Sequence, residues 1–80
     1  MITKEILEKM VIEAIKKQSG KASVLDVSKF IWDKYHDDLL KAGNILYTWQ
    51  YDIRWIAVKL REKRILKQAG SNKRGVWELA

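Results

Sequence analysis

Several residue types that commonly build catalytic or metal sites are missing from this 80-residue chain or are rare in it. The chain has no cysteine, which excludes disulfide bonds and thiolate ligands for a metal ion. The single histidine, His36, precedes Asp37 and Asp38, but adjacent residues on a helix point in different directions. We therefore expect no metal ion, no cofactor, no small-molecule substrate and no enzymatic activity.

Proline is also absent, so every residue can donate a backbone hydrogen bond to a helix or a sheet. No apolar run approaches the roughly 20 residues that a membrane-spanning helix needs. The N-terminus lacks the pattern of a signal peptide, and we expect a cytoplasmic protein with no membrane contact. The length indicates one domain, 1–80, and a hydrophobic content of 48% with four tryptophans can supply its core.

The net charge of +6 is unevenly distributed along the chain. Residues 1–44 contain eight lysines and seven acidic residues, whereas residues 45–80 contain eight lysines or arginines and only three acidic residues. The basic excess therefore lies in the C-terminal half, where an anionic partner is expected to bind. A solvated surface that only keeps the protein in solution explains the charge equally well.

Three segments show the i, i+3, i+4 spacing of apolar residues that an amphipathic helix buries on one face. They cover residues 3–18, about 24–35 and about 46–63, with a bridging strand at 21–22 and a polar connection at 36–44 that can include a helical turn around Leu39-Leu40. Ser23 and Asp26 are expected to cap the second helix. The expected core faces consist of Ile6, Leu7, Met10, Val11 and Ala14, then Val24, Val27, Phe30 and Ile31, then Trp49, Ile53, Ile56, Ala57 and Leu60.

Two short candidate strands, 65–69 and 76–79, follow the third helix and enclose a loop. Gly70 and Gly75 at the ends of this loop can adopt positive φ, which favours a β-hairpin. Three helices followed by a hairpin is the element order of a winged helix-turn-helix domain, an α+β fold that is mostly α. In that fold the second and third helices form the helix-turn-helix, and the two-stranded hairpin is the wing.

The C-terminal half also carries a recognisable pattern of aromatic and apolar residues. It consists of Trp49, Ile53, Trp55, Leu60, Ile65-Leu66 and Gly75-Val76-Trp77-Glu78-Leu79. Over residues 45–80 this pattern resembles the N-terminal winged-helix domain of Mrr-type restriction endonucleases, which precedes their nuclease domain. The chain departs from that family at Tyr51-Asp52, where a polar Asn-Arg pair is common. The resemblance implies a DNA-targeting module and not DNA cleavage.

A recognition helix places its N-terminal half in the major groove of DNA. There Gln50 can make paired hydrogen bonds to adenine and Arg54 to guanine. Tyr47, Thr48 and Tyr51 can contact phosphates, sugars or thymine methyl groups. The other expected DNA contacts are Arg61 on the same helix, Lys21 and Ser23 at the start of the second helix, and Ser71, Asn72, Lys73 and Arg74 in the wing.

Each of these assignments has a structural alternative. Tyr47, Tyr51 and Val58 could cover the wing or the first helix, Ser23 could serve only as a helix cap, and the wing loop could be a solvated tip. Asp52 would repel phosphate unless it pairs with Arg54 or Lys59.

The four tryptophans could in principle stack on bases of a single strand. At their spacings, Trp32, Trp49, Trp55 and Trp77 are expected to belong to the core instead.

The leading hypothesis is binding of double-stranded DNA, for transcription regulation or as the DNA-targeting piece of a restriction system. The alternative is a protein-interaction module that uses the aromatic stripe of Tyr47, Tyr51 and Trp55. A DNA reader should present Arg54, Arg61, Lys73 and Arg74 on one continuous surface, whereas an interaction module should expose an apolar patch.

Ile12 and Ile15 lie off the main apolar stripe of the first helix and have two interpretations. Either they widen its core face, or they form a surface through which two copies associate as a homodimer. Trp32 and Tyr35 would then add to that surface.

Overall fold

The first helix, α1 (Lys4–Lys17), begins at a side-chain cap and ends where the backbone turns left-handed. The computed structural model describes residues 2–68 and 75–80. At the start of α1, the hydroxyl of Thr3 accepts a hydrogen bond from the Ile6 amide at 3.2 Å. Ser19 and Gly20 have φ values of 64° and 90°, which end the helix. The expected helix 3–18 is confirmed, with its outermost residues acting as caps.

Strand β1 (Lys21–Ser23) leads directly into helix α2 (Val24–Leu40). Ser23 caps this helix, because its hydroxyl accepts a hydrogen bond from the Asp26 amide at 3.0 Å. The connection expected at 36–44 begins only at Lys41, and the helical turn considered around Leu39-Leu40 is present as a continuation of α2. The backbone departs from helical geometry at Tyr35 (φ −121°, ψ 15°), and the helical turn beyond it brings Leu39 into a fully buried position.

Helix α3 (Ile45–Glu62) follows after a short turn in which Gly43 has a φ of 68°. Its bounds agree with the expected 46–63 to within one residue. Its buried side chains are the five that the spacing predicted: Trp49, Ile53, Ile56, Ala57 and Leu60.

Strand β2 (Val76–Glu78) pairs antiparallel with β1, so that Ala22 lies opposite Trp77. Of the expected strand 65–69, the described residues 65–68 contain only an isolated bridge between Leu66 and Leu79. Beside this bridge, the Lys67 amide donates to the Glu78 carbonyl at 2.8 Å. Strand β2 therefore lies between β1 and the segment that follows α3. The expected loop falls at residues 70–75, of which 70–74 lie outside the described residues.

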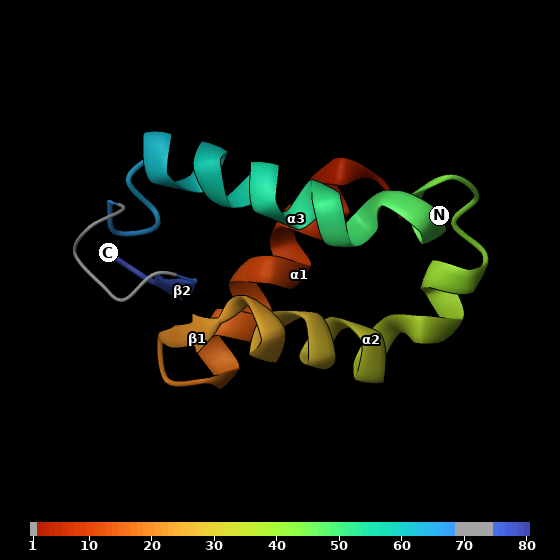
Figure 1. Ribbon diagram of the computed structural model, residues 1–80, viewed down its shortest axis with the longest axis horizontal. Coiled ribbons are helices and arrows are strands. Elements are labelled where there is room, and N and C mark those ends of the chain that lie inside the picture. The colour runs from red at the N-terminus through yellow and green to blue at the C-terminus, as the bar shows by residue number, and fades with distance from the viewer. Residues whose placement is uncertain (1, 69–74) are drawn as a thin grey trace.

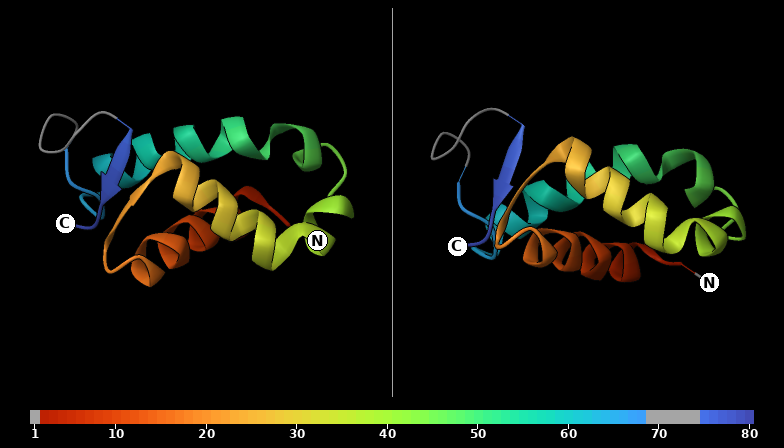
Figure 2. Two further views of the ribbon diagram at one scale, coloured as in Figure 1. Left: turned by 60° about the horizontal axis from the view of Figure 1, so that its bottom comes forward. Right: turned by 90° about the horizontal axis from the view of Figure 1, so that it is seen from below.

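The molecule is an α+β structure, mostly α, with three mutually packed helices and a two-stranded sheet among the described residues. Helices α2 and α3 are joined by the turn at one end of the long axis, and the sheet lies at the other end (Figure 1). Helix α1 packs against both of them (Figure 2). This arrangement leaves the outer side of α3 open to solvent.

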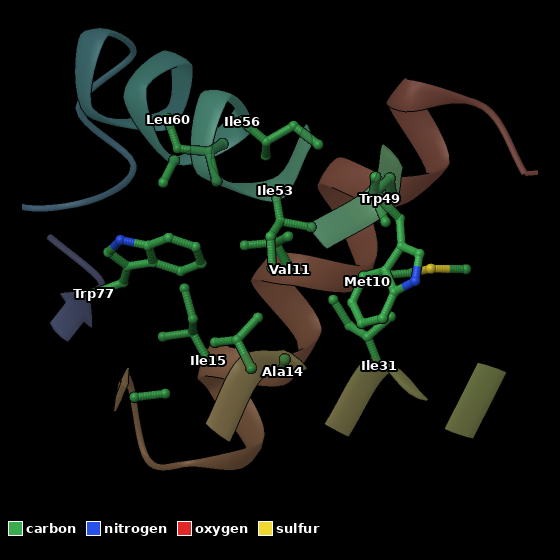
Figure 3. Packing of buried hydrophobic residues seen from close by; sticks show 14 of the residues in the cluster. Met10, Val11, Ala14, Ile15, Ile31, Trp49, Ile53, Ile56, Leu60 and Trp77 are labelled. Atoms are coloured by element: carbon green, nitrogen blue, oxygen red, sulfur yellow. The ribbon is translucent and has the colours of Figure 1, made fainter. Parts of the chain in front are cut away.

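The hydrophobic core runs between the helices from the turn to the sheet. Figure 3 shows Trp49 from α3 near Met10 and Ile31 at one end, and Trp77 from β2 near Ile15 and Leu60 at the other. Both tryptophans are only 4% exposed. Trp77 therefore adds a large buried apolar area to the contact between the sheet and the helices, beside Ala22 of β1 and Leu66.

Two expectations for α1 need correction. Ile6, which was placed in the core, is 39% exposed. Ile15 is completely buried and Ile12 is half-buried against the core, so these residues widen the core face. Ile15 is therefore not available as a contact for a second copy.

The four tryptophans divide into two groups, and the expectation that all four belong to the core is wrong for two. Trp49 and Trp77 are buried, whereas Trp32 and Trp55 are 41% and 59% exposed. Trp32 packs over Trp49, with ring planes 5° apart and centroids separated by 6.4 Å. Trp55 lies on α3 beside Tyr51, with a centroid distance of 6.2 Å and an edge-on geometry.

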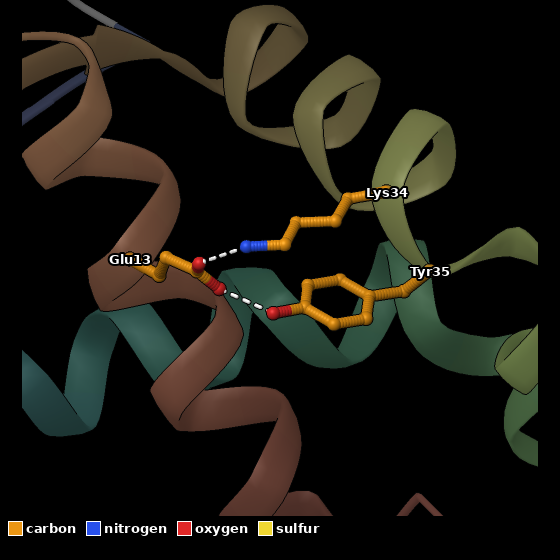
Figure 4. A network of polar contacts seen from close by, with 3 residues as sticks. All are labelled: Glu13, Lys34 and Tyr35. Atoms are coloured by element: carbon orange, nitrogen blue, oxygen red, sulfur yellow. Dashed lines mark hydrogen bonds and ion pairs between the residues drawn. The ribbon is translucent and has the colours of Figure 1, made fainter.

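A polar network joins α1 to α2. The carboxylate of Glu13 accepts hydrogen bonds from the Lys34 ammonium and the Tyr35 hydroxyl (Figure 4). The bond from Lys34, and then the one from Tyr35, holds the pKa of Glu13 below its ordinary value. The same carboxylate raises the pKa of Tyr35 and that of Lys34. Because Tyr35 lies where the helical geometry of α2 is interrupted, the network fixes that point against α1.

Candidate nucleic-acid interface

An open groove of about 680 Å³ runs between α2 and α3 on the surface. We call it the α2–α3 groove; it is lined by Val24, Leu25, Ser28, Lys29, Trp32, Asp33, Trp49, Gln50 and Arg54. The stacked rings of Trp32 and Trp49 contribute to its apolar lining, together with Leu25, which is 63% exposed. The groove therefore combines an apolar base with polar and charged side chains.

Two of the residues expected to contact DNA bases, Gln50 and Arg54, line this groove together. They are one helical turn apart on α3 and both are exposed. Lys29 from α2 lines the same groove, so two cations from different helices border it, against the single carboxylate of Asp33. The balance of charge in the groove is positive.

The structure separates Thr48 and Tyr51 from Gln50 and Arg54, although all four were expected to act together. The Thr48 hydroxyl donates a hydrogen bond to the Asp52 carboxylate at 2.8 Å. Tyr51 and Asp52 line a pocket between α1 and α3, on another side of α3. Asp52 is thus engaged by Thr48, in place of the Arg54 or Lys59 partner that was considered, and it does not line the α2–α3 groove.

Tyr47 and Arg61 occupy opposite ends of α3 and differ in exposure. Tyr47 is 84% exposed, so it covers neither the wing nor α1. Arg61 is half-buried, and its Nε atom is buried without a hydrogen-bond partner among the described residues. Its carbonyl accepts a hydrogen bond from the Gln68 side chain at 3.0 Å, which ties it to the segment after α3.

Lys21 and Ser23 occupy the ends of β1. Lys21 is exposed and lies opposite Glu78 in the sheet register. Ser23 is half-buried, and its hydroxyl is used by the cap of α2. The four expected wing contacts, Ser71, Asn72, Lys73 and Arg74, lie outside the described residues.

Sequence reasoning missed the contribution of α2 to this site. Leu25, Lys29 and Asp33 recur every four residues and lie away from the buried Val27 and Ile31. Placing α2 on a helical wheel would have identified this outer row. Its position beside Gln50 and Arg54 follows only from how α2 packs on α3, which the sequence does not state.

The described part of the chain was also compared with the requirements of a metal site and of a membrane-spanning helix. In residues 2–68 and 75–80, no three histidine or acidic side chains gather as ligands for a metal ion. Within the same residues, no helix has the length and apolar character that crossing a bilayer requires.

Comparison with known proteins found no family model, no curated protein and no solved structure that matches this chain.

Proposed function

We propose that this chain is a winged helix-turn-helix domain that binds double-stranded DNA, with α3 as the recognition helix. The observation that carries the proposal is the convergence of Gln50 and Arg54 from α3 with Lys29 from α2 on one open groove. Arginine and glutamine are the side chains that read guanine and adenine edges, and a nearby lysine suits a phosphate.

The arrangement of the elements supports the winged-helix interpretation. Helices α2 and α3 are consecutive, joined by the short turn 41–44, and both pack on α1. Strand β2 pairs with β1 on one side and bridges to Leu66 on the other. A hairpin between 66 and 79 would have its tip in the sequence of Ser71, Asn72, Lys73 and Arg74, where two adjacent cations suit the DNA backbone.

The two sides of α3 differ in a way that favours one orientation on DNA. Gln50 and Arg54 border a groove with a positive balance of charge. The pocket on the α1 side is lined by three carboxylates and two lysines, so it attracts phosphates less than the α2–α3 groove does. We therefore propose that the α2–α3 groove faces the DNA, and that Thr48 does not take part in DNA binding.

The test is a fluorescence-anisotropy titration of duplex DNA with matched alanine variants. Arg54→Ala and Lys29→Ala each remove one cation from the proposed interface, and Lys59→Ala removes one exposed cation from the other side of α3. All three variants lose one positive charge, so a difference between them reports position and not net charge. We expect Arg54→Ala and Lys29→Ala each to weaken binding by about 5- to 30-fold, and Lys59→Ala by less than about twofold.

Equal losses for all three variants would contradict the proposed orientation, because binding would then follow net charge alone. No binding of any duplex by the unmodified chain at low salt would overturn the DNA-binding function itself.

A separate observation favours an additional role in protein contacts. Tyr51 and Trp55 on α3 are 63% and 59% exposed and contact each other edge-on, which is a high exposure for two neighbouring aromatic side chains of one helix. Aromatic residues of this kind are enriched where proteins bind each other.

A further inference from the structure

A second surface lies on the side of α3 that faces α1. We call it the α1–α3 face; it surrounds a pocket of about 350 Å³ lined by Lys4, Glu5, Glu8, Tyr51, Asp52, Trp55, Ile56 and Lys59. None of these residues lines the α2–α3 groove. The proposal that follows therefore does not rest on DNA binding.

The centre of the α1–α3 face is aromatic. Tyr51 and Trp55 contact each other edge-on, with ring centroids 6.2 Å apart, and most of each side chain is open to solvent. Ile56 contributes a buried floor to the pocket beside them. Tryptophan and tyrosine with little side-chain freedom are the residues that most often anchor a protein interface.

The charges around this centre have both signs. Lys4 and Lys59 are basic, whereas Glu5, Glu8 and Asp52 are acidic. Glu8 is already paired with Lys63 at 3.2 Å. The remaining two lysines and two carboxylates balance each other, so this face has no net charge that would favour a nucleic acid, a strongly acidic protein or a strongly basic one.

A second copy of the same face carries the complement of both signs. In a two-fold arrangement each residue of one copy meets a residue of the other, so basic and acidic groups on the rim can be brought opposite each other around the paired aromatics. We propose that the α1–α3 face is a self-association surface through which two copies of this chain form a dimer, with Trp55 and Tyr51 at its centre.

The expected dimer is weak. The smallest specific interfaces bury about 600 Å² on each partner, which is about a tenth of the 5563 Å² surface of the chain. Interfaces at this small end of the range belong to weak, transient complexes, and the buried area does not by itself set the Kd. Sedimentation equilibrium between about 10 μM and 1 mM is suited to detecting such a dimer.

Two aromatic variants locate the interface. Trp55→Ala should shift the dimer Kd upward by at least tenfold, because it removes the central apolar contact. Tyr47→Ala is the matched control, since Tyr47 is an even more exposed aromatic residue of the same helix that does not line the α1–α3 face. It should leave the Kd within about twofold. Both side chains are exposed, so circular dichroism should show folded variants.

A charge exchange tests whether the partner is a second copy. Lys4→Glu with Lys59→Glu makes the rim acidic, and Glu5→Lys with Asp52→Lys makes it mainly basic. Each double variant alone should be monomeric at 1 mM, because its like charges meet across the two-fold axis. An equimolar mixture of the two should form a heterodimer more readily than the unmodified chain forms its dimer.

A monomeric unmodified chain at 1 mM would overturn the proposal, and a different occupant of this face would then have to be sought. A dimer that Trp55→Ala does not weaken, or a mixture of the two charge variants that stays monomeric, would overturn it as well.

Discussion

Trp32 of α2 lies over Trp49 of α3, with ring planes only 5° apart and centroids separated by 6.4 Å. The two residues differ in exposure, at 41% for Trp32 and 4% for Trp49. Trp32 therefore covers part of a core residue and also lines the α2–α3 groove. One aromatic contact thus links the core to the proposed DNA-binding groove.

This contact predicts unequal effects on stability. Trp49→Ala empties a buried site and should lower the free energy of unfolding by about 3–5 kcal/mol. Trp32→Ala removes a half-exposed ring and should lower it by about 1–1.5 kcal/mol. Urea denaturation followed by circular dichroism measures both, and equal losses would show that Trp49 is not the buried partner.

The Glu13 network predicts a dependence of stability on pH. The pKa of Glu13 is depressed in the folded state, so its contribution is present above the ordinary value of 4.5 and is lost as the pH falls through the lower folded-state pKa. Glu13→Gln should therefore lower the free energy of unfolding by about 1 kcal/mol at pH 7, and by progressively less as the pH falls below 4.5.

Stability at alkaline pH depends on Tyr35, whose pKa is raised in the folded state. The contribution of its hydroxyl to stability is present below the ordinary pKa of 10.0 and is lost as the pH rises through the higher folded-state pKa. Glu62 is an exposed carboxylate on α3, and Glu62→Gln serves as the control in both the acidic and the alkaline range. If the losses from Glu13→Gln and Glu62→Gln are equal at all pH values, the network does not contribute to stability.

Ser23 allows capping and phosphate binding to be separated. Its hydroxyl caps α2, so Ser23→Ala should lower the free energy of unfolding by about 1 kcal/mol. Ser23→Asp keeps a capping side chain and should leave stability nearly unchanged. A DNA phosphate near this end of α2 would be repelled by the added charge, so Ser23→Asp should weaken DNA binding more than Ser23→Ala does. The reverse order would place the DNA elsewhere.

Asp33 is the carboxylate that lines the α2–α3 groove. If DNA lies over this groove, Asp33→Asn removes a repulsion and should strengthen binding by about two- to fivefold at low salt. Asp52→Asn is the matched control, because Asp52 lies on the other side of α3. Anisotropy titrations in which both variants gain equally would point to net charge as the cause.

The helices were predictable because each carries its own local signal. The apolar spacing of α3 identified all five of its buried residues, and Ser23 and Gly20 mark the ends of neighbouring elements in the sequence itself. A helical turn around Leu39-Leu40 was anticipated, but its continuity with α2 was missed because residues 36–38 are polar. The conformation of residues 36–40 is determined by the burial of Leu39 in the tertiary structure, which the spacing of apolar residues does not reveal.

The candidate site was predictable in part. The exposure of Gln50, Arg54 and Tyr47 follows from the wheel of α3, and so does their approximate position. The wheel does not show that α3 has two different sides, because this depends on α2 packing beside Gln50 and on α1 packing beside Trp55. The exposure of Trp32 and Trp55 was missed for the same reason, since a tryptophan near the edge of an apolar arc is buried only if a neighbouring element covers it.

The most direct test of the account is the salt dependence of duplex DNA binding by the unmodified chain. Each phosphate that the protein neutralises contributes about −0.9 to the slope of log K against log salt concentration. Four or five contacts from the cations of the α2–α3 groove, α3 and the proposed wing give a slope near −4. Titrations at several salt concentrations should show that slope, whereas binding that is absent at low salt, or that does not change with salt, would contradict the account.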